Sequence, residues 1–319
     1  MGVSPWLKRG TIRSSKGCTV GRVYGFLLCF ILPVAVTVVP VAPQATAVAP
    51  VTPAAPVTMK IGLPENMFSG LPQAVVQRAS QPFQTMLEKQ SGLKGEIVVA
   101  RDHADLTERL RTGKLDVAVF HGFEYAWVKQ HPELVPLVIA APNSKIQACL
   151  VVNVNSKLKG AHELKGDSVA VPGGTKAHCH LYFDRLKANL PEGRCGVVTL
   201  KGKSIEDALD AVSDDACPAV LVDAATLVAY QKLKPGAGAA LKVLDQSEQF
   251  PPAVVVYRKG AFNAATTKNV RDGLVKCVET VEGQLLTSLW RLKGFEDATP
   301  QYQTELDKCL KAFPAPTKK

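Results

Sequence analysis

Short apolar runs alternate with amphipathic segments along the chain from residue 58 onward. The strands predicted in the first part are residues 58–64, 95–101, 115–120 and 134–141. The helices predicted between them are residues 70–91, 102–113 and 124–130. Asp102 is placed to cap the second helix, and Gly113 lies at its end. Short strands separated by amphipathic helices favour a parallel sheet covered by helices on both faces.

The pattern starts again after the polar break "PNSK" at residues 142–145. The strands predicted here are residues 147–154, 168–173, 195–201, 218–222, 240–245 and 253–258, and the helices are residues 176–189, 204–212 and 224–232, followed by a helical tail from Asn263. Two α/β units joined by two extended strands predict an α/β fold of two lobes with a cleft between them. Lobe one would contain residues 58–144 and 248–319, and lobe two residues 145–247.

The N-terminal region has the order of an export signal. Residues 1–22 contain five Lys or Arg and no acid, an apolar run follows over 24–41, and Ala45-Thr46-Ala47 supplies small residues of the A-x-A type. We therefore expect residues 1–47 to be a signal peptide and 48–57 a Pro/Ala linker, which makes the protein periplasmic or exported. The apolar run is also near the length that spans a bilayer, so an uncleaved membrane anchor remains an alternative.

Charge and motifs narrow the function classes. The net charge is +10, but the signal region carries five of the basic residues, and the remainder has no Lys/Arg cluster with interleaved aromatic residues. This favours small anionic ligands over nucleic acid. The chain has no G-x-S-x-G elbow, H-E-x-x-H helix, P-loop or G-x-G-x-x-G fingerprint, so we expect no enzyme and no cofactor.

Polar and aromatic side chains follow many of the predicted strands, which is where open α/β sheets bind their ligands. The strand of residues 115–120 is followed by "HGFEY" at residues 121–125. A purely structural turn needs the glycine but not the histidine and tyrosine. The alternative is a tight turn with a capping glutamate. The residues that follow predicted strands and could contact a ligand include Glu65, His103, His121, Tyr125, Gly174, Thr175, Lys176, Ser204 and Asp223.

The segment "GGTKAHCHLY" at residues 173–182 combines two possible sites. Its two glycines and Thr175 at a helix start resemble an anion-binding loop, to which Thr175 and Lys176 add donors. His178, Cys179 and His180 could instead hold a metal ion if the segment were extended. On a helix, His178 and His180 would diverge by about 200 degrees and could not face one metal.

The segment "ARDHADLTERLRTGKLDVAVFHGFEYA", residues 100–126, resembles the substrate-binding proteins of phosphate, phosphite and phosphonate ABC transporters. The matching pattern is Gly-Lys-x-Asp, an apolar strand, a turn and a Tyr. Weaker similarity continues in "GLPEN", in "ACLVVNVNSKLKGAHELKGDSVAVPGG" and in "LDQSEQFPPAVVVYRKG", over about residues 58–290. The resemblance implies a type II periplasmic-binding-protein fold, an ABC permease as partner and a monomeric protein.

The resemblance also implies roles for individual residues. It makes Phe120, His121 and Tyr125 part of the pocket wall, with His103 where the family often has an aromatic residue, and the Thr175 loop the anion-binding helix start. The chain departs from the family at three places. The family's Ser-Thr-Ser-Gly run is "GGTKAHC" here, its Ser-His pair appears as Lys203-Ser204, and an acid is replaced by Pro218. These departures bear on the ligand rather than on the fold.

These observations predict an exported two-lobed solute-binding protein that captures an anion such as phosphate or a phosphonate by hinge closure for a permease. Two alternatives remain: a membrane-tethered sensor of the same fold, and a metal-binding protein that uses His178, Cys179 and His180. An even number of cysteines follows the signal segment, which predicts disulfides, although cysteines packed in the core are the alternative. Cys277 and Cys309 are the first expected pair, since both fall in the C-terminal helices of lobe one.

Overall fold

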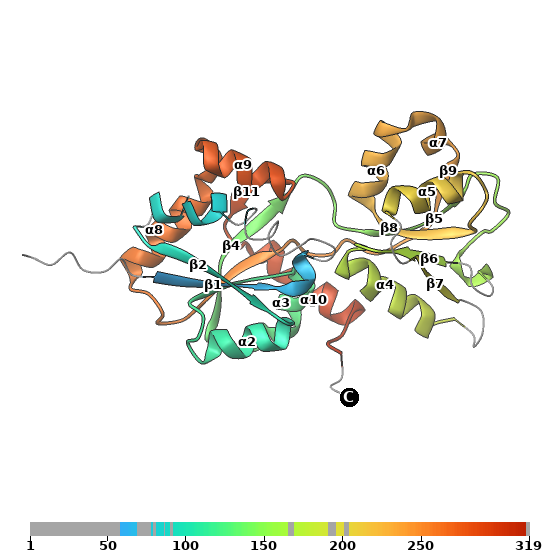
Figure 1. Ribbon diagram of the computed structural model, residues 1–319. Coiled ribbons are helices and arrows are strands. Elements are labelled where there is room, and N and C mark those ends of the chain that lie inside the picture. The colour runs from blue at the N-terminus through green and yellow to red at the C-terminus, as the bar shows by residue number, and fades with distance from the viewer. Residues whose placement is uncertain are drawn as a thin grey trace, which may run out of the picture. The chain divides into compact units, whose positions relative to one another are not determined.

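The computed structural model describes residues 58–68, 78, 81–85, 87–89, 92–164, 169–190, 196–200 and 204–316. The predicted signal segment and linker lie outside the described residues, as do Cys195, Lys203 and parts of the helix expected over 70–91. The described chain contains two sheets, each flanked by helices (Figure 1). None of its helices is both long and apolar enough to cross a membrane.

The first sheet has the strand order β11-β4-β10-β3-β1-β2. Its strands are β1 (Thr58–Pro64), β2 (Lys94–Ala100), β3 (Val117–Phe120), β4 (Leu134–Pro142), β10 (Val254–Arg258) and β11 (Leu292–Glu296). β1 pairs in parallel with β2 and β3, and Ile61 lies opposite both Ile97 and Val117. β10 and β11 run antiparallel to their neighbours, which makes the sheet mixed.

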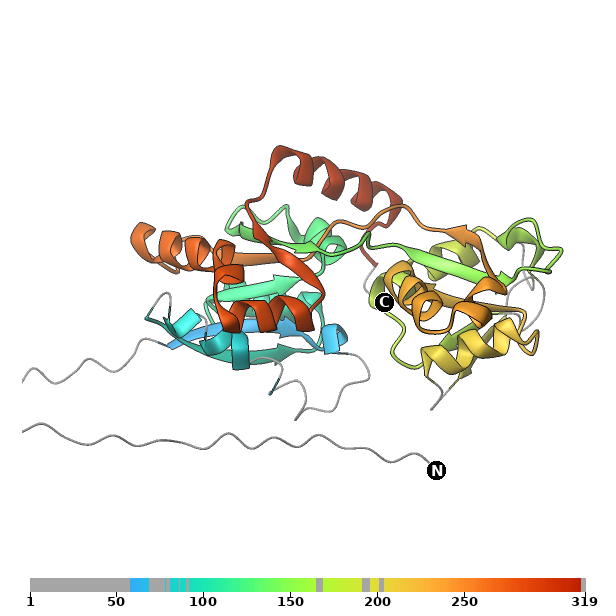
Figure 2. The same cartoon turned by 90° about the horizontal axis from the view of Figure 1, so that it is seen from above.

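Helices cover both faces of this sheet. They are α2 (His103–Arg111), α3 (Gly122–Val128), α8 (Ala264–Val275), α9 (Val281–Leu289) and α10 (Pro300–Ala312), with short 3-10 turns η1 (Glu65–Phe68) and η3 (Cys277–Glu279). Side chains alternate across a strand, so Val254 and Val256 pack with α2, α3 and α10, while Val255 packs with α8 and α9. Figure 2 shows α8 and α9 on one side of the strands.

The second sheet has the order β7-β6-β8-β5-β9. Its strands are β5 (Ala148–Asn153), β6 (Val169–Pro172), β7 (Val197–Leu200), β8 (Ala219–Asp223) and β9 (Leu241–Gln246). Its helices are α4 (Ala177–Ala188), α5 (Ile205–Ser213), α6 (Ala224–Leu233) and α7 (Pro235–Ala239), with the 3-10 turn η2 (Ala161–Glu163). Leu150 faces the cluster that contains α4, and Val151 faces the cluster that contains α5 and α6.

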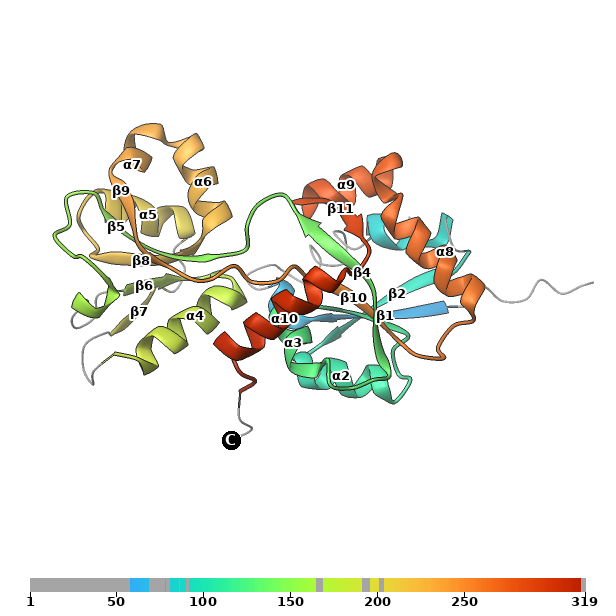
Figure 3. The ribbon, with the colours of Figure 1, turned by 180° about the vertical axis from the view of Figure 1, so that it is seen from behind.

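Two crossing segments, residues 143–147 and 247–253, connect the sheets (Figure 3). They are hydrogen-bonded to each other, since Phe250 N–H donates to the carbonyl of Ile146 at 2.8 Å. Where the second segment passes the start of β5, Ser247 N–H donates to the carbonyl of Ala148 at 2.9 Å. The Ser247 hydroxyl oxygen accepts from Ala148 N–H at 2.9 Å. The chain therefore passes between the sheets as a bonded pair rather than as two independent linkers.

The α/β class and the two flanked sheets are confirmed. The sheets are less parallel than the strand–helix alternation predicts, because the chain enters the second sheet through β5, which runs antiparallel to both neighbours. β11 was not predicted, since "LKGFE" lacks an apolar run and lies in the helical tail.

The predicted bond between Cys277 and Cys309 is wrong, because all five cysteines that the structure describes carry free thiols. The two side chains pack in separate clusters, Cys277 with α8 and α9 and Cys309 with α3. The alternative of core cysteines therefore holds for this pair.

Candidate ligand-binding site

His121 follows β3 and is the N-cap residue of α3. The next residue must be glycine, because a Cβ at Gly122 would lie 2.2 Å from the carbonyl oxygen of Pro251. This close approach holds the turn against the second crossing segment. The imidazole stacks on the Phe123 ring, with centroids 5.3 Å apart and planes 5° from parallel. Its Nε2 is buried without a hydrogen-bond partner among the described residues.

Burial, and after it the positive charge of Lys176, lowers the pKa of His121 to about 4. The ring is therefore neutral at physiological pH. A neutral imidazole whose Nε2 is buried and unpartnered is a polar group that a ligand can satisfy.

Glu124 is a buried carboxylate in the first turn of α3. It accepts hydrogen bonds from Asn66 Nδ2 at 2.8 Å and from the backbone N–H of His121 at 3.2 Å. Burial raises its pKa, against the lowering effect of these two hydrogen bonds. Glu124 thus has the capping role considered for the "HGFEY" turn. Its hydrogen bond from Asn66 also links the end of β3 to η1, which follows β1.

The start of α4 is built by the "GGTKAH" turn after β6. Gly174 has φ of +83°, a conformation that favours glycine. Thr175 is buried, and its hydroxyl donates to the carbonyl of Pro172 at 2.8 Å. The hydroxyl hydrogen is therefore already used in a bond within the turn. Lys176 is the N-cap residue and provides no side-chain cap. The other described helices of eight residues or more each have a side-chain cap, from Asp102, Ser204, Asp223, Asn263, Thr280 or Thr299.

His178 lies in the first turn of α4, and its ring packs against Phe250 with centroids 5.4 Å apart. The Nε2 atom of this ring is buried without a hydrogen-bond partner in the described part of the chain. Burial lowers its pKa to about 4, with the nearby His121 and Lys176 acting in the same direction and Asp223 opposing them. His178 is therefore also neutral at physiological pH.

Ring contacts join the two histidines. His121 stacks on Phe123, Phe123 meets Phe250 edge-on at 6.0 Å, and Phe250 contacts His178. His121 and Phe123 come from the first sheet's half of the chain, His178 from the second, and Phe250 from a crossing segment. Two unpartnered Nε2 atoms thus flank one aromatic cluster, beside the uncapped start of α4.

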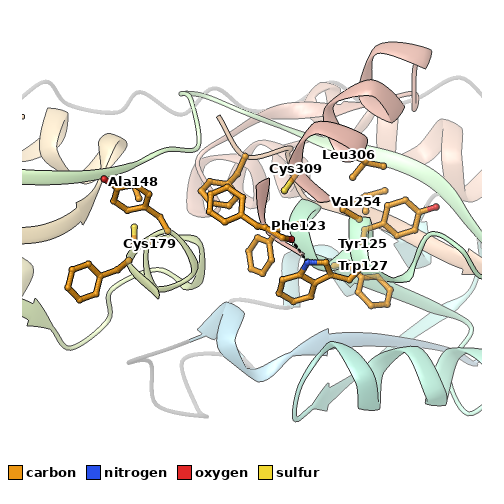
Figure 4. Close-up of a cluster of buried hydrophobic side chains, with 14 of the residues drawn as sticks. Phe123, Tyr125, Trp127, Ala148, Cys179, Val254, Leu306 and Cys309 are labelled. Carbon is orange, nitrogen blue, oxygen red and sulfur yellow. Dashed lines mark hydrogen bonds between the residues drawn. The ribbon is translucent and has the colours of Figure 1, made fainter. Parts of the chain in front are cut away.

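The other residues predicted at the ends of β1, β2 and β3 lie in several environments. Phe120 and Tyr125 are in the core, and the Tyr125 hydroxyl donates to the carbonyl of Leu134 at 3.3 Å. Burial raises the pKa of Tyr125 to about 12. The His103 ring meets Trp127 at 4.8 Å, and Glu65 is exposed. Figure 4 shows Phe123, Tyr125 and Trp127 in this apolar cluster.

Ser204 and Asp223 cap helices in the second half. Ser204 accepts from the N–H of Asp207, and Asp223 accepts from the N–H and hydroxyl of Thr226. Asp223 is nearly buried and also acts electrostatically on His178, whereas Ser204 is exposed at the start of a different helix. Asp223 is thus brought toward the α4 site, and no contact among the described residues connects Ser204 with it.

The structure does not bring His178, Cys179 and His180 together on a metal. Cys179 is buried, His180 is exposed, and both lie on α4, where their directions diverge. Within the described ranges, no group of three His, Cys, Asp or Glu side chains could hold a metal ion.

Sequence reasoning missed a residue of this site. Phe250 lies in a crossing segment and carries no local motif, and only the fold brings it to His178. The signal that could have found His178 as a ligand contact was its place in the first turn after the "PGGT" loop.

Comparison with known proteins gives a family model, "ABC transporter, phosphonate, periplasmic substrate-binding protein", that matches residues 67–302. Among solved structures, XAC2383 from Xanthomonas citri bound to chloride ion is 15% identical, with a TM-score of 0.62 over 80% of this chain and 97% of that one. PhnD1 from Prochlorococcus marinus in complex with methylphosphonate is 16% identical, with a TM-score of 0.58 over 81% and 98%. A binding component of an ABC phosphonate transporter from Pseudomonas aeruginosa, PA3383, is 14% identical, with a TM-score of 0.56 over 80% and 86%.

Proposed function

Because this chain belongs to the family of periplasmic substrate-binding proteins of phosphonate ABC transporters, which capture a solute for a transporter, we propose that it binds a small oxyanion of the phosphonate class at the start of α4. The family is one of transport binding proteins, not of enzymes. The protein is exported, acts as a monomer and catalyses no reaction on its ligand. Export proceeds through cleavage of the N-terminal signal.

The unpartnered Nε2 atoms of His121 and His178 carry this proposal. A buried polar atom without a hydrogen bond costs about 1–3 kcal/mol, so a ligand that satisfies both atoms recovers that free energy. The backbone N–H groups at the uncapped start of α4 favour a negative charge. Lys176, at the N-cap position, adds a full positive charge.

The two histidines lie in different lobes, which explains how ligand binding changes the conformation. His121 comes from lobe one and His178 from lobe two, so a ligand between them stabilises the closed state over any open state in which the two are apart. The crossing segments 143–147 and 247–253 are the hinge. The closed form is the one that the permease recognises.

A phosphonate fits the departures from the family pattern. The chain has one hydroxyl in the α4 turn, Thr175, and its proton is already donated to Pro172. Lys176 and the two histidines take the place of the missing hydroxyls. The ligand class is supported by the methylphosphonate that PhnD1 from Prochlorococcus marinus binds.

Isothermal titration of the purified protein with methylphosphonate, phosphite, phosphate and sulfate tests this function. We expect at least one phosphorus oxyanion to bind, and Lys176→Gln to weaken that binding about tenfold, because a charge-assisted contact is lost. The matched control is Lys187→Gln, near the other end of α4, which should leave the affinity unchanged.

Two results would contradict the proposal. One is that none of the four anions binds to correctly folded protein. The other is that an anion binds equally well to the wild type and to Lys176→Gln.

A further inference from the structure

The C-terminal helix α10 contacts the second crossing segment near each end of the helix (Figure 3). Near its start, the Tyr302 hydroxyl donates to the carbonyl of Pro252 at 3.0 Å. At its C-cap, the Phe313 ring stacks on Phe250, and the Phe313 carbonyl accepts from Trp127 Nε1 at 2.8 Å. Trp127 belongs to α3. Phe313 is therefore attached to lobe one by its backbone, while its ring lies against the crossing segment.

Helix α4 of lobe two contacts the same two rings. His178 packs on Phe250, and the guanidinium carbon of Arg185 lies 4.1 Å from the centroid of the Phe313 ring. Seven residues are close to two full helical turns, so His178 and Arg185 project from one face of α4, about 10 Å apart along its axis. The first residue of this face lies at the candidate ligand site, and the second lies beyond it.

Glu248, in the crossing segment, holds Arg185 in this position. Arg185 Nη1 and Nη2 donate to the two carboxylate oxygens of Glu248, at 3.0 and 2.6 Å. A bidentate pair fixes the plane of the guanidinium, and a guanidinium over an aromatic ring is attracted to its face. The Arg185 side chain is 30% exposed and Phe313 only 3%, so the contact between them is partly shielded from water.

The contact between Arg185 and Phe313 joins the two lobes through protein groups alone. Phe313 moves with lobe one, because its carbonyl is bonded to Trp127. Arg185 moves with lobe two, because it lies in α4. Any rotation about the crossing segments that separates α4 from the end of α10 must break the contact.

We propose that Arg185 and Phe313 form a latch that favours the closed arrangement of the lobes before any ligand binds. This inference rests on the hinge closure of the proposed function, and it adds a residue pair that sets the affinity from outside the ligand site. Only the closed fraction of the free protein binds at full strength, so the apparent affinity falls in proportion to that fraction.

The size of the effect separates a latch from a contact that only stabilises the fold. A cation–aromatic contact at a partly exposed site changes an equilibrium about two- to fivefold. Such a factor is a small part of the stability of a folded domain. It acts in full on a hinge equilibrium, because the open and closed states lie close in free energy.

The first test is small-angle X-ray scattering of the full chain in the absence of ligand. We expect a larger radius of gyration for Arg185→Gln than for the wild type, because the lobes of the open state lie further apart. Saturation with methylphosphonate should return the variant to the wild-type value. The control Lys187→Gln removes an equal charge from the same helix, where Lys187 pairs with Asp184, and should scatter as the wild type does.

The second test is isothermal titration with methylphosphonate of Arg185→Gln, Phe313→Leu and the double variant. Each single substitution should weaken binding about two- to fivefold. The double variant should lose no more than either single variant, because the two residues act through one contact. Glu248→Gln leaves the guanidinium and the ring in place and should have a smaller effect. Circular dichroism and thermal unfolding establish that each variant is folded.

The outcomes separate the latch from anion capture. Identical scattering and affinity in Arg185→Gln and the wild type, an equal effect of Lys187→Gln, or additive losses in the double variant would overturn the latch and leave anion capture intact. If Arg185→Gln expands the free protein but methylphosphonate, phosphite and phosphate all fail to bind the wild type, the latch stands and anion capture is wrong.

Discussion

The ring of Phe313 stacks on the ring of Phe250, with centroids 4.6 Å apart and planes 30° from parallel. Phe313 follows α10 near the end of the described chain, and Phe250 lies in a crossing segment. The Arg185 guanidinium, from α4, also lies 4.1 Å from the centroid of the Phe313 ring. Trp127 Nε1 donates a hydrogen bond to the Phe313 carbonyl at 2.8 Å. The C-terminal helix thus ends on residues from three separate parts of the fold.

Phe313→Ala should destabilise the protein by about 3–5 kcal/mol, as expected for removal of a buried phenyl ring. Urea unfolding measures this change. The control is Leu285→Ala on α9, where the side chain is 57% exposed and the expected change is within about 0.5 kcal/mol. Equal effects of the two substitutions would contradict the structural role of Phe313.

The unliganded protein should lose stability in mild acid because of His121 and His178. Their folded pKa of about 4 lies below the unfolded value of about 6.5, so the stabilisation is present above pH 6.5 and is lost as the pH falls toward 4. From pH 7 to pH 5 the loss should be on the order of 2 kcal/mol per histidine.

Urea unfolding of the wild type, His178→Gln and the control His180→Gln at both pH values measures this loss. The His178 variant should lose about half as much stability as the wild type between pH 7 and pH 5, and the His180 variant as much as the wild type. Identical losses in all three proteins would show that the pKa of His178 is not lowered in the folded protein.

Gly122→Ala should disrupt the turn that carries His121. The new Cβ would lie 2.2 Å from the Pro251 carbonyl oxygen and 2.5 Å from that of Pro252, and both are backbone atoms that cannot rotate away. We expect a loss of about 2 kcal/mol or more in unfolding free energy, together with weakened anion binding. Gly236→Ala, where no atom lies within 4 Å, should be neutral or slightly stabilising. A Gly122 variant as stable as the wild type would contradict the close approach.

Ser247→Ala should weaken the bonded pair of crossing segments. The substitution leaves the backbone N–H of Ala148 without the hydroxyl acceptor that now lies 2.9 Å away, in a buried position. The expected cost is about 1–3 kcal/mol in unfolding free energy. The control is Ser288→Ala on the exposed surface of α9, which should change little. Amide hydrogen exchange should become faster at Ala148 and Phe250 in the Ser247 variant, and unchanged exchange would contradict the prediction.

Local patterns determined much of the fold. The apolar runs predicted the strands within one or two residues, and capping signals placed the starts of α2 and α5 at Asp102 and Ser204, where the structure has them. β11 escaped prediction because "LKGFE" is half exposed and pairs with β4 through its backbone. Pairing of that kind depends on a distant strand and leaves no periodic signal in the local sequence.

The candidate site was less predictable. His121 and the α4 loop were found because strand ends in open sheets mark ligand sites. Tyr125 was expected at the pocket wall, but its position one turn into α3 directs it to the core and to the Leu134 carbonyl. Phe250, which the His178 ring contacts, is remote in sequence, so only the folded chain shows the surroundings of that ring and its unpartnered Nε2.

The reactivity of the free thiols can report on local opening of this protein. Burial raises the pKa of Cys149 to about 11 and of Cys309 to about 12, and it also raises the pKa of Cys179 and Cys277. Only a thiolate reacts, so each of these four side chains can be alkylated only when its surroundings open. Cys149 and Cys179 report on the second sheet, and Cys277 and Cys309 on the first. Peptide-resolved alkylation rates, with and without an anion, would therefore give separate opening free energies for the two halves without any introduced label.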